Sequence, residues 1–260
     1  MSNIDLVSII MPSYNNGLYI KKTINSVLGQ SYTNWELLIV DDCSYDNSIK
    51  IINTFCDKRI KVIKNNVNCG AAICRNKALA LAKGKWIAFL DSDDYWLPNK
   101  LEKQTEFMIN NNYCFSFTDY RICNDGMLSD YIITAPDIVT KRKLYNWCYF
   151  FTSTVMYDRE KIGLIQIEDL KKNNDYAMWF HALDKTNAYR LPECLAYYNK
   201  HENSISSGSK LKLIKYHYIL YRKELKKSKI MSIVLTVNNL FFGVIKKIKY
   251  KKKVRDYIHE

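Results

Sequence analysis

Four consecutive residues, Asp91-Ser92-Asp93-Asp94, have the composition of a cation site and directly follow the apolar run at 86–90. Carboxylates two positions apart in a loop can point at one divalent cation, which takes oxygen ligands, keeps several waters and bridges phosphates. The same residue types also favour the first turn of a helix, where their oxygens accept hydrogen bonds from free backbone N–H groups. Taken alone, the segment leaves both interpretations open.

Three other polar segments stand in the same relation to an apolar run. PSYNN follows the apolar run at 6–11, DDCSYDNS follows the run at 36–40, and NVNCGAAICRN follows the run at 60–64. A structural turn needs turn-forming residues at such places, but it does not need paired carboxylates at two of them. Asp41 and Asp42 can therefore be read as a solvated turn or as part of a site.

The apolar runs recur about every 25 residues, and segments with helical periodicity separate them. Helices are expected from just after Asn16 to Gly29, after Ser44, over 71–82 and from about Pro98. This alternation predicts an α/β fold with a mostly parallel, Rossmann-like sheet flanked by helices. Because ligands of such sheets bind beyond the carboxyl ends of the strands, the polar segments are expected to meet there.

The pattern is less regular from about 112 to 208. Short strands are expected at 114–118, 152–157 and 195–198, with one helix at about 175–186.

PSYNN, VDDCSYDNS, NCGAAICRN and FLDSDDYW, in this order, resemble the motifs of the family 2 glycosyltransferases, which have the A-type nucleotide-diphosphosugar transferase fold. The resemblance covers roughly residues 5–206. It implies a metal-dependent, inverting hexosyltransferase that moves a sugar from a UDP-sugar to a hydroxyl of a polyprenyl-diphosphate-linked glycan, in O-antigen or capsule synthesis. We therefore expect a catalytic domain, 1–208, with a nucleotide-binding half (1–105) and an acceptor-binding half (106–208). Residues 209–260 are expected to form a helical basic tail.

Carried over residue by residue, the resemblance implies a set of donor contacts. Tyr14 packs near the base, Asp42 accepts the uracil N3–H, and Arg75 offers its fork of donors to anionic oxygens unless it is an ordinary surface arginine. Asp91 reaches the ribose side, and Asp94 is expected to cap the following helix. The residues expected to bind the nucleotide-sugar are Pro12, Ser13, Tyr14, Asp42, Asn68, Gly70, Arg75, Asp91 and Ser92.

The family takes its general base from an E-D-aromatic motif that opens a helix. Asp175, in Asn174-Asp175-Tyr176, matches that base, although Asn174 replaces the Glu. As base it takes the acceptor proton while the oxygen attacks opposite the leaving phosphate, which inverts the anomeric centre. Asp175 can also be read as a helix N-cap. The pair Glu168-Asp169 spells the motif literally but is followed by Leu-Lys-Lys.

The family's metal ligands map onto two positions. Asp93 is the expected carboxylate ligand of a divalent cation, Mn²⁺ or Mg²⁺. His201 lies in YYNKHENSIS, which resembles the family's closing YRxHxxS segment, and is expected as a second ligand unless it is simply structural. Asn199 stands where the family has Arg, which leaves neutralisation of the diphosphate to the cation and to Lys200.

The net charge of +13 is concentrated in the tail, where 209–260 hold 15 Lys and Arg against 3 Asp and Glu. Two amphipathic helices are expected, over 211–225 and 230–248. The apolar stretch at 230–245 is shorter than the roughly 20 residues of a membrane span. We expect a helix on the bilayer surface, with Lys246, Lys247, Lys249 and 251–253 toward anionic headgroups, or a helix packed on the catalytic domain.

Other protein classes fit the sequence less well. A nucleic-acid-binding protein would not leave residues 1–208 with 24 basic and 23 acidic side chains. A sugar-phosphate nucleotidyltransferase gives no reason for the NDYAMW segment at 174–179. The eight cysteines form no CxxC pair, which argues against zinc and disulfide frameworks. The first residues do not resemble a signal peptide, so we expect a cytoplasmic protein that is peripheral on the inner face of the plasma membrane.

Overall fold

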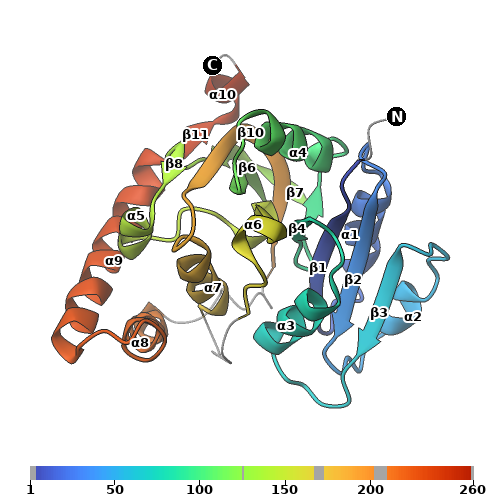
Figure 1. Ribbon diagram of the computed structural model, residues 1–260, viewed down its shortest axis with the longest axis horizontal. Helices are drawn as coiled ribbons and strands as arrows, with labels where there is room; N and C mark the ends of the chain where they lie inside the picture. The colour runs from blue at the N-terminus through green and yellow to red at the C-terminus, as the bar shows by residue number, and fades with distance from the viewer. Residues whose placement is uncertain (1–3, 125, 167–172, 202–209, 259–260) are drawn as a thin grey trace.

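The computed structural model describes residues 4–124, 126–166, 173–201 and 210–258. Its first half has the predicted alternation of strands and helices (Figure 1). The elements are β1 (Val7–Ser13), α1 (Ile20–Leu28), β2 (Trp35–Asp41), α2 (Ser48–Ile52), β3 (Ile60–Lys64), α3 (Ala71–Leu81), β4 (Trp86–Phe89), β5 (Tyr95–Trp96) and α4 (Lys100–Asn110). β1 pairs in parallel with β2 and β4, and β2 pairs in parallel with β3, so the predicted parallel arrangement is confirmed.

The central strands are buried on both faces. Ile9 and Ile10 of β1 are both fully buried but belong to different hydrophobic clusters, because successive side chains of a strand point to opposite faces. Leu37 and Leu38 of β2 divide in the same way. This explains the continuous apolar runs of the sequence, which are typical of parallel strands covered by helices on both sides.

The second half extends the same sheet with antiparallel pairs and with one parallel pair, between β6 and β10. Its elements are β6 (Phe115–Asn124), β7 (Met127–Ile133), β8 (Ile138–Val139), α5 (Lys141–Asn146), η1 (Thr152–Thr154), β9 (Met156–Asp158), α6 (Arg159–Ile162), α7 (Asn174–Ala182) and β10 (Ala188–Lys200). β9 pairs antiparallel with both β4 and β6 and so joins the two halves. With β11 (Lys251–Lys253) of the C-terminal segment, the strands run in the order β11-β7-β6-β9-β4-β1-β2-β3, and β5, β8 and β10 lie off this path.

Several element boundaries differ from the sequence expectation. α1 begins at Ile20, and Leu18 lies in the preceding turn with 89% of its surface exposed. Residues 152–154 form a 3₁₀ turn before a three-residue strand. β10 is 13 residues long, and its pairing with β6 shifts register on either side of Cys194. Such irregularities hide the two-residue periodicity by which a strand is recognised.

The C-terminal segment returns to the sheet. It consists of α8 (Lys210–Ile219), a π-helical turn (Leu220–Glu224), α9 (Lys229–Lys249), β11 (Lys251–Lys253) and α10 (Val254–Ile258). β11 pairs antiparallel with β7, and α9 packs against α5 and α8 along one edge of the molecule (Figure 1). The packing of the long helix on the rest of the fold, one of the two expectations for it, is therefore confirmed. The proposed boundary after residue 208 lies outside the described residues.

Candidate active site

The polar segments after β1, β2 and β4 meet at one edge of the sheet, as predicted. The backbone N–H of Asn16 donates to Ser48 Oγ at 2.9 Å, and the Asn16 side chain donates to Ser92 Oγ. The N–H of Gly17 donates to Asp46 Oδ2 at 2.9 Å. Each of the three segments therefore holds the others in place.

Asp42 fastens the loop after β3 to the end of β2. Its carboxylate accepts hydrogen bonds from the backbone N–H groups of Cys69 (2.8 Å) and Gly70 (2.7 Å) and from Asn65 Nδ2 (2.8 Å). Burial raises the pKa of Asp42, but these donors outweigh it and leave the pKa below its usual value. Gly70 has φ +86°, which favours glycine where its N–H must reach the carboxylate.

Asn65, which the sequence interpretation did not single out, is the buried amide of this loop, whereas Asn68 is exposed. The position of Asn65 directly after β3 was the available signal.

The residues at the end of β1 differ from one another in exposure. Pro12 pairs with Val40, and the Ser13 carbonyl accepts the N–H of Asp42 at 2.8 Å. Tyr14 keeps 43% of its surface exposed.

Arg75 connects the loop after β4 to the start of α7. Its Nη2 lies 2.6 Å from Asp91 Oδ1, and its Nη1 donates to Asn174 Oδ1 at 3.0 Å. The side chain is buried, which lowers its pKa, yet the charges of Asp91 and Asp175 more than compensate and raise it. Arg75 is therefore not a surface arginine. Asn174, the residue that replaces the family's Glu, is its second acceptor.

Asp93 and His201 lie together although 108 positions separate them in the sequence. His201 Nε2 is 3.0 Å from Asp93 Oδ2, and its ring stacks on Tyr19 with the centroids 4.6 Å apart. Burial and the neighbouring charge of Asp91 raise the pKa of Asp93, against a lowering contribution from His201. Tyr19, which supports the imidazole, was not recognised in the sequence.

Asp94 does not cap the following helix, contrary to the expectation. The N-cap of α4 is Asn99. Asp94 is fully buried, where its carboxylate accepts Ser153 Oγ–H at 2.5 Å and the N–H of Asn199 at 3.0 Å. Burial, followed by the charges of Asp93 and Asp91, raises its pKa well above the usual value. Asp94 thus ties the loop after β4 to the turn at 152–154 and to β10.

Asp175 lies in the first turn of α7 but is not its N-cap, which is Asn173. Its Oδ2 accepts the hydroxyl of Thr152 at 2.9 Å, and its Oδ1 accepts the N–H of Tyr176 at 2.8 Å. Thr152, another residue that the sequence did not indicate, therefore orients the carboxylate. The alternative base at Glu168-Asp169 lies outside the described residues.

The Asp93–His201 pair has the spacing of two ligands of one divalent cation. Ligands at about 2.1 Å in adjacent octahedral positions lie about 3.0 Å from each other. The observed oxygen-to-nitrogen separation of 3.0 Å matches that spacing. In the part of the chain that the structure describes, no group of three or more His, Cys, Asp or Glu residues is arranged to hold a metal. A cation at this pair would take its remaining ligands from water or from a bound substrate.

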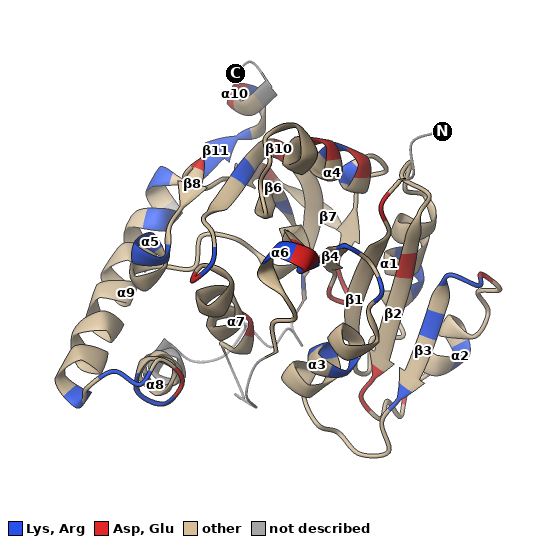
Figure 2. Cartoon of the chain, in the orientation of Figure 1, with Lys and Arg blue, Asp and Glu red and all other residues tan. Residues whose placement is uncertain are grey.

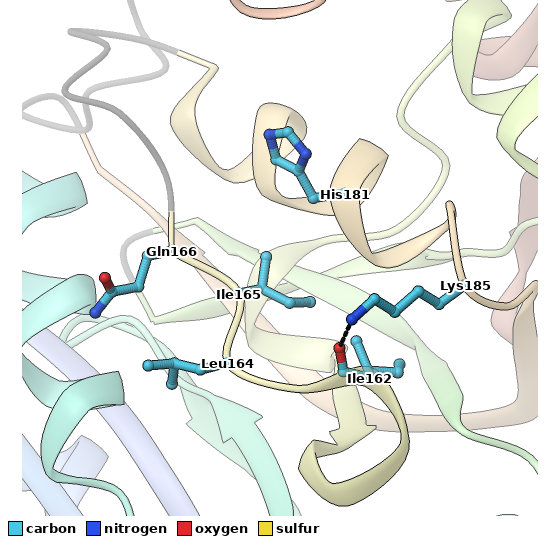
Figure 3. Close-up of a pocket in the computed structure, with 6 residues that line it drawn as sticks. All are labelled: Ile162, Leu164, Ile165, Gln166, His181 and Lys185. Atoms are coloured by element: carbon cyan, nitrogen blue, oxygen red, sulfur yellow. Dashed lines mark hydrogen bonds between the residues drawn. The ribbon is translucent and has the colours of Figure 1, made fainter.

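A separate hollow of about 200 Å³ lies beside the other end of α7 (Figure 3). It is lined by Ile162, Leu164, Ile165, Gln166, His181 and Lys185. Its polar groups already have partners, because Lys185 Nζ donates to the Ile162 carbonyl at 2.6 Å and His181 Nε2 lies 3.0 Å from Glu224 Oε1. None of the residues predicted to bind donor or metal lines it.

The model of the family described as Glycosyl transferase family 2 matches residues 8–163. The chain belongs to this family. Among curated members, the putative teichuronic acid biosynthesis glycosyltransferase TuaG of Bacillus subtilis (strain 168) is 45% identical over 222 residues, which cover 84% of this chain and 88% of TuaG. The Escherichia coli enzyme WfgD, named as a UDP-Glc:alpha-D-GlcNAc-diphosphoundecaprenol beta-1,3-glucosyltransferase, is 42% identical over 205 residues, covering 78% of this chain and 80% of WfgD.

Solved structures agree with this family 2 assignment at the level of the fold. The S. aureus TarS fragment 1–349 in complex with UDP-GlcNAc superposes with a TM-score of 0.70 and 22% identity, covering 91% of this chain and 72% of TarS 1–349. The Pyrobaculum calidifontis mannosyltransferase PcManGT, in complex with GDP-Man and Mn²⁺, gives a TM-score of 0.64 and 14% identity. The superposition covers 94% of this chain and 76% of PcManGT. The expected family and its A-type fold are confirmed.

Proposed function

We propose that this family 2 member is a metal-dependent, inverting glycosyltransferase that moves a sugar from a UDP-sugar to a hydroxyl of a lipid-linked glycan. The observation that carries the proposal is that Arg75 links the loop that bears Asp93 to the turn that bears Asp175. Asp93 pairs with His201 on the donor side, while Arg75 joins the neighbouring Asp91 to the turn of α7 that bears Asp175. One carboxylate is thereby assigned to the leaving group and the other to the acceptor.

The donor lies across the edge formed by the first four strands. Tyr14 is exposed enough to stack on the base, and the lowered pKa of Asp42 keeps its carboxylate ionised at neutral pH. The residues assigned to the nucleotide-sugar are Pro12, Ser13, Tyr14, Asp42, Asn68, Gly70, Arg75, Asp91 and Ser92. The choice of a uridine nucleotide is supported by WfgD, which is named as using UDP-Glc, and by the TarS complex with UDP-GlcNAc.

Asp93 and His201 hold the divalent cation, Mn²⁺ or Mg²⁺. When bound, the cation supplies positive charge that stabilises the nucleoside diphosphate as it leaves. The protein adds little charge of its own for that purpose, since Asn199 replaces the family's Arg and Arg75 is engaged by Asp91 and Asn174. Transfer is therefore expected to depend strongly on the cation.

Asp175 accepts the proton of the acceptor hydroxyl. The acceptor oxygen forms a bond to the anomeric carbon as the bond from that carbon to the diphosphate oxygen breaks, so the configuration inverts in one displacement. The proton ends on Asp175, and the electron pair of the broken bond ends on the nucleoside diphosphate. Thr152 Oγ1, 2.9 Å from Asp175 Oδ2, holds the carboxylate in one orientation.

The acceptor is a glycan on polyprenyl diphosphate, and the pathway is the synthesis of a bacterial surface polysaccharide such as O-antigen or capsule. The names of WfgD, which specifies a diphosphoundecaprenol acceptor, and of TuaG support this choice. Because such an acceptor is confined to a membrane, we propose that the enzyme works as a peripheral protein on the cytoplasmic face of the plasma membrane.

The test is a transfer assay with a panel of nucleotide-sugars, diphosphoundecaprenol-linked acceptors and Mn²⁺ or Mg²⁺. We expect one uridine donor to give a product that is one sugar heavier by mass spectrometry. NMR coupling constants should show an anomeric configuration opposite to that of the donor, and chelation with EDTA should abolish transfer. A product that retains the donor configuration would contradict the displacement, and one carrying the nucleotide would indicate a nucleotidyltransferase.

A further inference from the structure

The long helix α9 faces the protein with its polar side. Among the α9 residues whose burial the structure describes, the buried ones are Ser232, Thr236, Asn239 and Gly243, and their spacing of three and four residues places them on one face. Asn239 Nδ2 donates to Tyr176 Oη at 3.0 Å and to Tyr221 Oη at 3.2 Å. At Gly243 a Cβ would lie 2.4 Å from the ring of Trp147, so the helix could not approach this closely with a larger residue.

The opposite face of α9 is apolar and exposed. Its large hydrophobic side chains have between 37% and 79% of their surface exposed. They are Ile230, Ile233, Val234, Val237, Leu240, Phe241, Val244 and Ile248. Their spacing forms a single stripe, about 27 Å long at 1.5 Å per residue. A surface helix of a globular protein normally turns such a stripe toward the core, so this one is reversed.

Lysines flank the apolar stripe at both ends. Exposed lysines are found before it and after it, and Figure 2 shows basic segments at the two ends of α9 with an uncharged stretch between them. They are Lys226, Lys229, Lys249, Lys251 and Lys253. Lys246 was expected to face lipid headgroups, but its side chain points toward the protein, where Nζ donates to the Cys148 carbonyl at 3.1 Å. Burial lowers its pKa to about 8.

We infer that α9 is the surface by which the folded enzyme docks on an anionic lipid bilayer, lying in the plane of the membrane. The apolar stripe would enter the acyl boundary while the flanking lysines contact lipid phosphates. By length and composition, residues 229–246 would also suit a membrane span. A span, however, would pull the polar seam of Asn239 and Gly243 off the domain and expose it to lipid.

Charge favours a bilayer over a second copy of the chain as the occupant of this surface. Residues 209–260 carry 15 basic and 3 acidic side chains, so two copies apposed through α9 would bring like charges together. The inference rests on the proposed function and deepens it by naming the lipid surface. Because Asn239 bonds to Tyr176, the neighbour of Asp175, the docking helix directly supports the helix that carries the base.

The test is sedimentation of the full chain with vesicles, comparing the variants V237S/F241S and L81S/I109S. The second variant also removes two exposed apolar side chains, from α3 and α4. We expect the native chain to bind vesicles of mixed phosphatidylglycerol and phosphatidylcholine, with weaker binding to phosphatidylcholine alone. V237S/F241S should bind about tenfold more weakly. L81S/I109S should bind like the native chain.

All four side chains are exposed, so urea unfolding should show both variants as stable as the native chain. Equal vesicle binding by the two variants would overturn the inference. So would light scattering that shows a dimer of the native chain, broken by V237S/F241S, without vesicle binding. Sedimentation uses neither donor nor acceptor, and transfer can be measured on a soluble acceptor analogue. A failure of membrane docking is therefore distinguishable from a failure of the proposed transfer reaction.

Discussion

Replacing Arg75 by Met should damage stability and catalysis together. Arg75 is 6% exposed, and its guanidinium bonds to Asp91 on the donor side and to Asn174 at the start of α7. Met fills much of the same volume but removes the charge and both hydrogen bonds. The Asp91 carboxylate is then left without the guanidinium that pairs with it, and the loop after β4 loses its link to the turn that carries Asp175.

The expected loss of stability follows from the burial of the two partners. Removing one partner of a fully buried ion pair costs about 3–5 kcal/mol. Because 28% of the Asp91 side chain is exposed and can be rehydrated by water, we expect about 2–3 kcal/mol for R75M. A displacement of the base or donor by about 1 Å is expected to lower kcat by about 10²-fold.

Arg190 provides a matched control. It pairs with Asp119 through two bonds of 2.8 and 2.9 Å, and Asp119 is only 1% exposed. Among the described residues, the other bonds of this pair go to Asp137 and Tyr257, neither of which is assigned to the candidate site. R190M should therefore also lose stability in urea unfolding, while its kcat, measured where both variants are folded, stays near the native value. If R75M kept the kcat of R190M, the assigned role of Arg75 in joining the two halves of the site would be wrong.

Two further predictions concern the base and a buried histidine. D175N should lower kcat by about 10²–10⁴-fold with little change in donor affinity, measured by initial rates and calorimetry, and near-normal turnover would rule out Asp175 as the base. Burial lowers the pKa of His217 from 6.5 to about 4. Between these pH values the unfolded chain binds a proton at His217 and the folded chain does not, so the free energy of unfolding should fall as the pH drops from about 6.5 to 4. Urea unfolding of H217Q should show a smaller loss over that range than the native chain, and an equal loss would contradict this assignment.

The parallel half of the fold was predictable because its signals are local. Each buried strand reads as a continuous apolar run, and Gly70 and the paired acids mark where the chain turns at the strand ends. The edge at which these segments meet follows from parallel pairing alone. Contacts such as Asp93 with His201 depended on the family resemblance, because 108 positions separate the two residues and no local rule brings them together.

Other features required the tertiary structure. Asp94 follows the pattern of a helix cap, but burial beside Ser153 and the N–H of Asn199 outweighs that local preference. Thr152 and Tyr19 carry no signal, since a hydroxyl or an aromatic ring at those positions is unremarkable in sequence. The amphipathic pattern of α9 was visible, yet only the packing of Asn239 shows which face turns toward the protein.

The most direct test of the proposed active site is an anomalous-scattering map from crystals soaked with MnCl₂ and UDP. We expect one manganese peak within about 2.5 Å of both Asp93 Oδ2 and His201 Nε2, in contact with the diphosphate oxygens. D93N crystals treated in the same way should lack the peak. UDP bound with manganese at another position, or with none at this pair, would contradict the account.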